Sequence, residues 1–148
     1  MAFYPVLVEN LVVWEHLKVL AIDDSQDILL LLDTWLSGAG YDTVLATTAK
    51  DGLPIISAGN IDVLLTDILM PDMDGIEVIR YLRSRHPDLW IVAISGGGTY
   101  LTANTALCLS HELGADRILK KPFSKTELLS VIRRAGSCST GLKPIPMP

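Results

Sequence analysis

The residues of this chain that could do chemistry are polar side chains that follow short apolar runs. They are the adjacent acids Asp23 and Asp24, then Asp67, Ser95 and Lys121. Carboxylates gathered in one crevice repel one another, and a hard cation with oxygen ligands such as Mg²⁺ relieves that repulsion. A carboxylate oxygen beside such an ion can attack phosphorus and form an acyl phosphate. A lysine and a hydroxyl would stabilise the phosphate oxygens, so the set predicts a metal-assisted phosphoryl-transfer site.

Strand and helix patterns alternate along the chain and would place these residues at strand ends. Continuous Val/Ile/Leu runs are typical of strands buried on both faces of a parallel sheet. The predicted strands are 19–22, 43–46, 61–66, 90–94 and 117–120. Parallel strands place their carboxyl ends at one edge of the sheet, where ligands bind. Three carboxylates and a lysine would therefore meet in one pocket.

Helices are predicted between the strands, each from its own signals. Ser25 or Asp27 could cap the first, which would end near residues 38–40. Thr48 would cap the second, in which Gly52 and Pro54 favour a poor or late start. Later helices are expected at 76–85, at about 102–113, and after a capping box at residues 124–127. This simple alternation predicts an α/β fold, a parallel sheet with helices on both faces.

Composition limits the class of protein. The 148 residues suit one domain, and 49% apolar with 20% charged residues is typical of a folded globule. The net charge of −5 and the scattered basic residues argue against a nucleic-acid surface. No apolar run approaches the length of a membrane span, and Met1–Trp14 lacks the basic start of a signal peptide. Two cysteines, Cys108 and Cys138, form no disulfide framework, which fits a reducing cytosol.

From about Leu17 to Ala135 the sequence resembles the receiver domain of two-component response regulators, the family that includes the stand-alone CheY-like chemotaxis receiver. Three sequence motifs carry the resemblance: Ile22-Asp23-Asp24-Ser25, Leu65-Thr66-Asp67 followed by Met70-Pro71-Asp72-Met73-Asp74-Gly75, and Lys120-Lys121-Pro122-Phe123. The resemblance implies a flavodoxin-like (βα)5 doubly wound fold with a five-stranded parallel sheet of order 2-1-3-4-5. It divides the chain into an N-terminal extension (1–16), a receiver domain (17–135) and a flexible C-terminal tail (136–148).

The resemblance also implies a role for each site residue. Asp67 would be the phospho-acceptor. Mg²⁺, the implied cofactor, would be held by Asp23, Asp24, Asp67 and the main-chain carbonyl of Leu69. Lys121 would bind the phosphate, and the Lys121–Pro122 peptide bond is a candidate cis bond. Ser95 corresponds to the hydroxyl of the conformational switch.

One position departs from the family's pattern. Three residues before Lys121 the family has an aromatic side chain that rotates inward behind the switch hydroxyl, and this chain has Ile118. The Ser95 half of the switch is expected to remain, whereas the output face is expected to respond differently.

The resemblance implies a cytoplasmic signalling module rather than an enzyme, although it takes part chemically in phosphotransfer and in its own dephosphorylation. The expected partners are a sensor histidine kinase or histidine phosphotransfer protein and a downstream protein target. Direct nucleic-acid binding and membrane binding are not expected, and a homodimer is left open. The role of the apolar N-terminal extension is also left open.

Three alternatives to a single-domain phosphorylated receiver stay open. One is a pseudo-receiver that docks proteins without phosphorylation, slightly favoured by Ile118. Another is that the chain is the N-terminal fragment of a longer transcriptional regulator. The third is an aspartyl-phosphate phosphotransferase or a haloacid-dehalogenase-like hydrolase. The third fits less well, because those enzymes place Asp-x-Asp at the first strand, whereas this chain has adjacent acids there.

Overall fold

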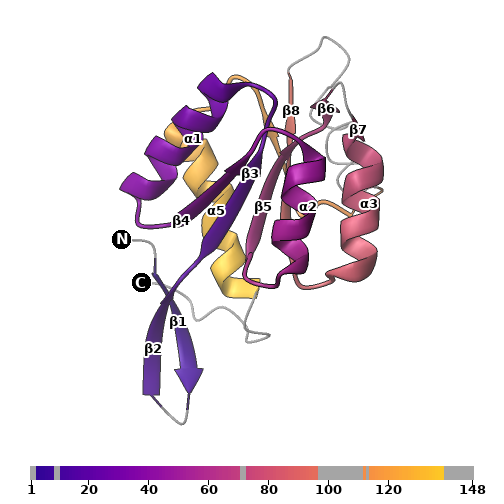
Figure 1. Cartoon of the computed structure of the whole chain (residues 1–148). Helices are drawn as coiled ribbons and strands as arrows, with labels where there is room; N and C mark the ends of the chain where they lie inside the picture. The colour runs from indigo at the N-terminus through magenta and orange to yellow at the C-terminus, as the bar shows by residue number, and fades with distance from the viewer. Residues whose placement is uncertain (1–2, 9–10, 71–72, 97–111, 113, 139–148) are drawn as a thin grey trace.

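A computed structural model describes residues 3–8, 11–70, 73–96, 112 and 114–138 of the chain (Figure 1). Its centre is a parallel five-stranded sheet of order β4-β3-β5-β8-β9. The strands are β3 (Lys18–Ile22), β4 (Asp42–Ala46), β5 (Val63–Asp67), β8 (Trp90–Ser95) and β9 (Arg117–Lys120). In chain order these are the first to fifth strands of the sheet, so the predicted order 2-1-3-4-5 is confirmed.

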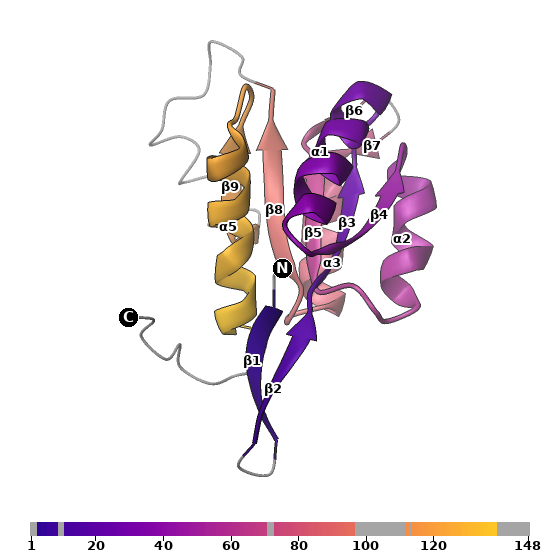
Figure 2. The same cartoon turned by 90° about the vertical axis from the view of Figure 1, so that its left-hand side faces the viewer.

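Four helices are described, and they cover both faces of the sheet: α1 (Gln26–Gly38), α2 (Ala49–Ser57), α3 (Gly75–Arg85) and α5 (Lys125–Cys138). Helices α1 and α5 pack with one apolar core cluster, and α2 and α3 pack with a second cluster on the opposite face (Figures 1 and 2). Strands β5 and β8 are buried throughout, because they are central strands covered on both sides. The helix predicted at 102–113 lies outside the described residues, except for Glu112 in its final turn.

Capping side chains explain where several helices begin. Ser25, rather than Asp27, is the N-cap of α1, and its hydroxyl accepts a hydrogen bond from the Ile28 N–H. Ser124 accepts from the Glu127 N–H at the start of α5, as the capping-box pattern predicts. Helix α5 continues past Ala135 to Cys138.

The prediction of a late start for α2 is wrong. The helix begins at Ala49, directly after its N-cap Thr48, whose hydroxyl accepts from the Asp51 N–H. Pro54 lies inside the helix, while Gly52 is buried against β3. A Cβ atom on Gly52 would lie only 2.5 Å from Cδ1 of Ile22, so glycine permits this close contact. Tertiary packing therefore overrides the weak helix propensity of this segment.

Two small antiparallel ladders lie outside the main sheet. The segment after Asp67 forms the two-residue strands β6 (Leu69–Met70) and β7 (Met73–Asp74), which pair with each other. The N-terminal extension forms a hairpin of β1 (Phe3–Val8) and β2 (Leu11–His16). The hairpin projects beyond the amino-terminal edge of the sheet, away from the carboxyl ends of the strands (Figures 1 and 2).

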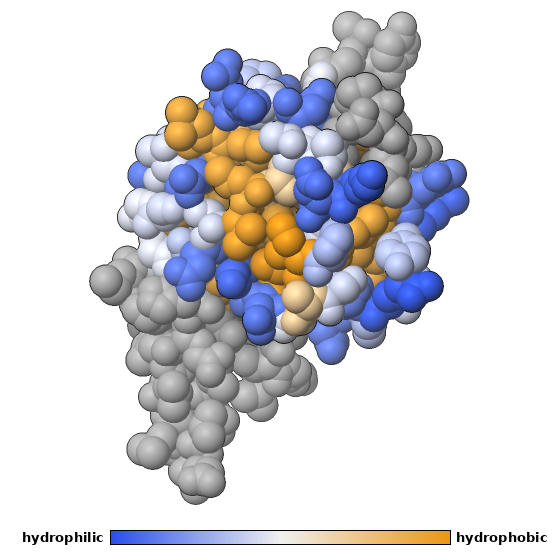
Figure 3. All heavy atoms as spheres, viewed as in Figure 1, coloured by the Kyte–Doolittle hydropathy of each residue, from blue (hydrophilic) through white to orange (hydrophobic). Residues whose placement is uncertain are grey.

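Apolar side chains reach the surface around α1 and the edge strand β4, on the face shown in Figure 3. The most exposed large apolar residues of this region are Leu30, Leu45 and Leu31, at 64%, 39% and 37%. Within the described residues, no helix is both long and apolar enough to cross a membrane.

Candidate phosphoryl-transfer site

The sheet brings four predicted site residues to its carboxyl edge. Asp67 is the last residue of β5, and Asp23 directly follows β3, in which Ile22 is paired with Thr66. Ser95 ends β8, one residue beyond the partner of Asp67, and is paired with Lys120 at the end of β9. The Lys121 N–H donates to the Ser95 carbonyl at 2.8 Å, so a main-chain hydrogen bond fixes the backbone position of Lys121. The parallel register therefore places these residues at neighbouring strand ends.

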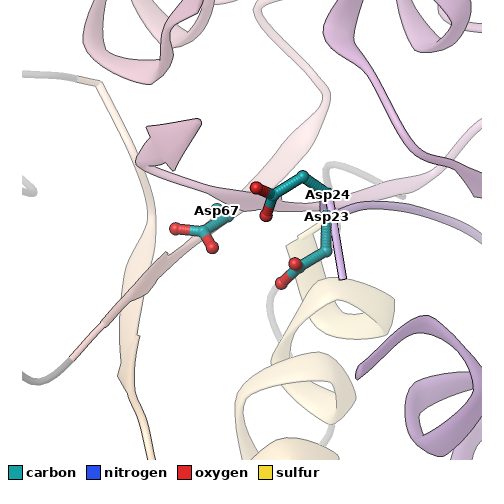
Figure 4. Close-up of side chains that lie close together, drawn as sticks. All are labelled: Asp23, Asp24 and Asp67. Atoms are coloured by element: carbon teal, nitrogen blue, oxygen red, sulfur yellow. The ribbon is translucent and has the colours of Figure 1, made fainter. Parts of the chain in front are cut away.

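The carboxylates of Asp23, Asp24 and Asp67 form one cluster (Figure 4). An oxygen of each lies within 4.8 Å of the others. Asp23 and Asp67 are 0% and 5% exposed, whereas Asp24 is open to solvent. Two of the three acids are thus buried, and the third is accessible to solvent.

Lys121 connects the two buried acids. Its Nζ donates to Oδ2 of Asp23 and to Oδ2 of Asp67, both at 3.0 Å. Partial burial alone lowers the pKa of Lys121. The hydrogen bonds and negative charges of Asp23 and Asp67 outweigh burial and raise this pKa above its ordinary value. Lys121 is therefore charged at neutral pH, but three carboxylates against one ammonium leave the cluster with a net negative charge.

Asp23 is held in a fixed orientation by the chain around it. Its N–H donates to the Ala46 carbonyl at 3.2 Å, which ties the end of β3 to β4. Its Oδ1 accepts from the Ser25 N–H at 2.9 Å, while Oδ2 accepts from Lys121. Because Ser25 also caps α1, the start of this helix and the buried acid are positioned together. In the sequence, the signal for this turn is an acid two residues before a capping serine, because a carboxylate can accept from the N–H two residues further on.

The remaining predicted residues lie around this cluster. Ser95 is 2% exposed, which places its side chain inside the edge of the sheet. Leu69 is the first residue of β6 and lies two positions after Asp67. The Ile68 N–H donates to the Ile94 carbonyl at 3.0 Å, which anchors this segment to β8. Ile118 is partly buried and packs with the core cluster of α2 and α3. The Lys121–Pro122 bond is cis, as the resemblance predicts.

One aromatic pair near the site was not anticipated. Phe123 follows the cis bond, and its ring meets Trp35 of α1 edge to face, with ring centroids 6.2 Å apart. Both side chains pack against the core cluster between α1 and α5. Sequence spacing alone does not reveal this contact, because the two residues come from opposite ends of the domain. The pair joins the segment that carries Lys121 to the helix that follows Asp23 and Asp24.

Comparisons with known proteins give matches over most of the chain. A family profile described as "Response regulator receiver domain" matches residues 19–133. The chain is 36% identical to the DNA-binding transcriptional regulator NtrC of Rhizobium meliloti over 117 residues, covering 79% of this chain and 23% of that protein. It is 35% identical to the response regulator MprA of Mycobacterium leprae, covering 79% of this chain and 50% of MprA. The chain thus spans half or less of the length of these curated relatives.

Solved structures show the same likeness in three dimensions. The chain is similar to a response regulator receiver domain protein from Clostridium thermocellum, with a TM-score of 0.73 and 28% identity, covering 82% of this chain and 94% of that one. It is also similar to the chemotaxis response regulator CheY4 of Vibrio cholerae, with a TM-score of 0.72 and 28% identity, covering 82% and 99%. From the strand order, the acidic cluster and these matches, we conclude that the chain belongs to the response regulator receiver family.

Proposed function

We propose that this receiver accepts a phosphoryl group on Asp67, with Mg²⁺ as cofactor, and that phosphorylation changes a protein-interaction face. The observation that carries the proposal is the cluster of Asp23, Asp24 and Asp67 within 4.8 Å, with Lys121 bridging Asp23 and Asp67. The family match and the position of Asp67 at the end of the central strand β5 support the same assignment.

The residues present fit a magnesium ion. All the side-chain donors are carboxylate oxygens, the cluster is net negative, and Asp24 is accessible from solvent. Asp23, Asp24, Asp67 and the Leu69 carbonyl would hold the ion. When bound, it would neutralise negative charge shared by the carboxylates and the incoming phosphoryl group.

In the proposed transfer, a carboxylate oxygen of Asp67 attacks the phosphorus of a phosphohistidine on the donor protein. A P–O bond to Asp67 forms as the P–N bond breaks, and the histidine leaves with the electron pair of that bond. Lys121 already lies beside Asp67 and would pair with a phosphoryl oxygen as charge accumulates there. Attack of water on the phosphorus of the acyl phosphate would break the P–O bond to Asp67, releasing inorganic phosphate and the free carboxylate, which is the self-dephosphorylation step.

Ser95 and Ile118 lie on the strands through which the signal would pass. In the sheet register Ala93 is paired with Ile118, and Ser95 with Lys120. We infer that the Ser95 hydroxyl moves toward a phosphoryl group on Asp67 and that this biases a pre-existing equilibrium between two arrangements. Ile118 has no aromatic ring to rotate, so the response at β9 is expected to be a shift in aliphatic packing.

The partners follow from the proposed chemistry. We propose a cytoplasmic sensor histidine kinase, or a histidine phosphotransfer protein, as donor, and a protein target for the phosphorylated face. The relative NtrC is described as DNA-binding, and this chain covers 23% of its length. We therefore expect no nucleic-acid binding by the receiver domain itself, and this expectation does not extend to a longer protein that would include it. A longer regulator that includes this receiver remains the alternative.

Intact-mass spectrometry after incubation with phosphoramidate, whose P–N bond resembles that of phosphohistidine, tests the proposal. The wild type should gain one phosphoryl group with Mg²⁺ and none with a chelator. Asp67→Asn should gain none, whereas Asp51→Asn, which changes an acid in the first turn of α2, should behave as wild type. Failure of the wild type to react, under conditions that label CheY4, would instead favour a docking pseudo-receiver.

A further inference from the structure

The hairpin of β1 and β2 is a two-stranded sheet that is separate from the main sheet. Two strands alone are marginally stable in water, and three or more are normally needed. The sequence of the two strands is almost entirely apolar, with Glu15 as the one acidic residue and no lysine or arginine. Edge strands usually carry charged residues or proline to prevent pairing with another chain. Strand β1 contains a proline, whereas residues 11–14 of β2 include neither a proline nor a charged residue.

Pro5 determines which backbone groups face outward. It is paired with Trp14, and because proline has no N–H this cannot be a pair that exchanges two hydrogen bonds. Pairs alternate in an antiparallel ladder, so Leu7 and Val12 are also a non-hydrogen-bonded pair. The N–H and C=O groups of Val12 and Trp14 therefore point away from β1, toward the outer edge of β2. The corresponding edge of β1 lacks a donor at Pro5.

The two edges also differ in their surroundings. Strand β1 lies beside α5 and contacts it (Figure 2). Within the described part of the chain, β2 is paired only with β1, and no strand lies along its outer edge. Among the described residues, the outer edge of β2 thus has no paired strand, and residues 11–14 of β2 include neither a charged residue nor a proline. An added strand would satisfy these outward-facing donors and acceptors together through main-chain hydrogen bonds.

We propose that the outer edge of β2 pairs antiparallel with β2 of a second copy of this chain, giving a four-stranded sheet of order β1-β2-β2-β1. A two-fold axis at Trp14 pairs that residue with Trp14 of the second copy, and Val12 with His16 of the second copy. The interface is then self-complementary, as a two-fold dimer requires. The inference goes beyond the proposed function, since it does not depend on phosphorylation.

Charge favours a second copy over an acidic or basic partner. The chain has a net charge of −5, but β1 and β2 carry little of it, so two hairpins repel each other less than other parts of the surface would. In the register centred on Trp14, Glu15 lies opposite Val13 of the second copy, so the two carboxylates do not oppose each other. The nearly uncharged strands offer no complement to a charged peptide.

The small size of the contact is typical of a weak or transient dimer. Each strand has six residues and spans roughly 20 Å. We expect pairing of two such edges to bury less than the roughly 1,200 Å² at which specific, stable interfaces begin. We therefore expect a dimer with a Kd in the micromolar range, which dissociates on dilution.

Sedimentation velocity of the full chain, without phosphoryl donor, from roughly 1 to 500 µM tests the proposal over this range of affinities. The wild type should shift from monomer toward dimer as concentration rises. Val12→Pro removes an outward N–H of β2 and should weaken dimerisation at least tenfold. The matched control is Leu7→Pro. Leu7 is the cross-strand partner of Val12, and its N–H points outward from β1 rather than from β2, so this variant should dimerise as the wild type does. A monomeric wild type, or equal weakening by both variants, would overturn the proposal.

A cross-linking experiment covers the case in which a proline variant unfolds the hairpin. In a Cys108→Ser, Cys138→Ser background, Trp14→Cys would place two cysteines at a hydrogen-bonded pair, where Cα atoms are about 5.5 Å apart and a disulfide can form. Mild oxidation should give a covalent dimer with Trp14→Cys and not with Leu7→Cys. Equal yields from the two variants, or no dimer from Trp14→Cys, would contradict the assigned edge.

Discussion

The ammonium of Lys121 lies 3.0 Å from the carboxylate of Asp67, and the same nitrogen lies 3.0 Å from Asp23. One cation from the end of β9 therefore compensates two buried acids from the ends of β3 and β5. This arrangement has a role even before any phosphoryl group arrives, because it lets two carboxylates remain buried beside each other.

Replacement of Lys121 by methionine should destabilise the metal-free protein. Breaking a fully buried ion pair costs about 3–5 kcal/mol, and the Lys121 side chain is 23% exposed, so we expect a loss of about 1–3 kcal/mol. Urea unfolding in the presence of a chelator measures it. Lys120→Met, which changes an exposed neighbour, should cost less than about 0.5 kcal/mol. Equal costs for the two variants would contradict the compensating role of Lys121.

The contribution of Lys121 should have a defined dependence on pH. Its pKa is raised in the folded protein, so its stabilisation is fully present below the unfolded-state value of 10.5 and is lost as pH rises through the folded-state pKa. Burial also raises the pKa of Tyr41 above its usual value, against the opposing charge of Arg133, so Tyr41 also contributes to the pH dependence of stability at alkaline pH. The difference in unfolding free energy between wild type and Lys121→Met isolates the lysine. It should stay constant from about pH 7 to 9 and shrink above about 10.5; a difference that falls between pH 7 and 9 would be inconsistent.

Magnesium should stabilise the protein through Asp24. A ligand at 100 times its Kd stabilises the folded state by about 2.7 kcal/mol, and this should be visible as a rise in Tm on adding Mg²⁺. Asp24→Asn should abolish most of this rise while leaving the Tm in chelator nearly unchanged, because the side chain is exposed. Asp27→Asn, an exposed acid in the first turn of α1, is the control and should keep the full rise. A wild-type response to Mg²⁺ in Asp24→Asn would remove Asp24 from the ligand set.

Gly52 should be intolerant of a side chain because of Ile22. Gly52→Ala places a Cβ 2.5 Å from Cδ1 of Ile22, and overpacking of this kind costs about 1–3 kcal/mol. In an Ile22→Val background, which lacks Cδ1, the same change should cost clearly less. Gly38→Ala meets nothing within 4 Å and should be neutral or slightly stabilising. A double-mutant cycle by chemical denaturation checks the coupling, and additivity would show that Ile22 is not the obstacle.

Arg83 should contribute strongly to stability although no sequence motif marks it. Its guanidinium donates to the carbonyls of Gly114, Pro87 and Leu89 and to the carboxylate of Asp116. Arg83→Met removes all four bonds, and we expect a loss of about 2–4 kcal/mol. Arg85→Met removes only a guanidinium stacked on the exposed ring of Tyr81 and should cost less than about 1 kcal/mol. Thermal unfolding of the two variants makes the comparison, and similar Tm values would refute the anchoring role.

The central sheet and the acidic site were predictable because local sequence signals and topology agree. Buried apolar runs identify β5 and β8, and parallel order then brings Asp67, Asp23 and Lys121 to one edge. The capping role of Ser124 is equally local. Each of these features depends on residues close in sequence or on a rule common to all parallel sheets.

Features that depend on contacts between distant residues were not predictable. The close packing of Gly52 against Ile22 and the hydrogen bond from Arg83 to the Gly114 carbonyl both join residues far apart in sequence. The hairpin was missed for a different reason. Its strands are apolar at nearly every position, so they lack the alternation that identifies an exposed strand.

The most direct test of the central claim is to identify the residue that carries the phosphoryl group. Borohydride reduces an acyl phosphate to the alcohol, which converts the labelled aspartate to homoserine, and peptide mass spectrometry locates it. After treatment with acetyl phosphate and Mg²⁺, homoserine should occur at position 67 and should be absent when a chelator replaces Mg²⁺. Homoserine at position 23 or 24, or at no position, would contradict the assignment of Asp67 as the phospho-acceptor.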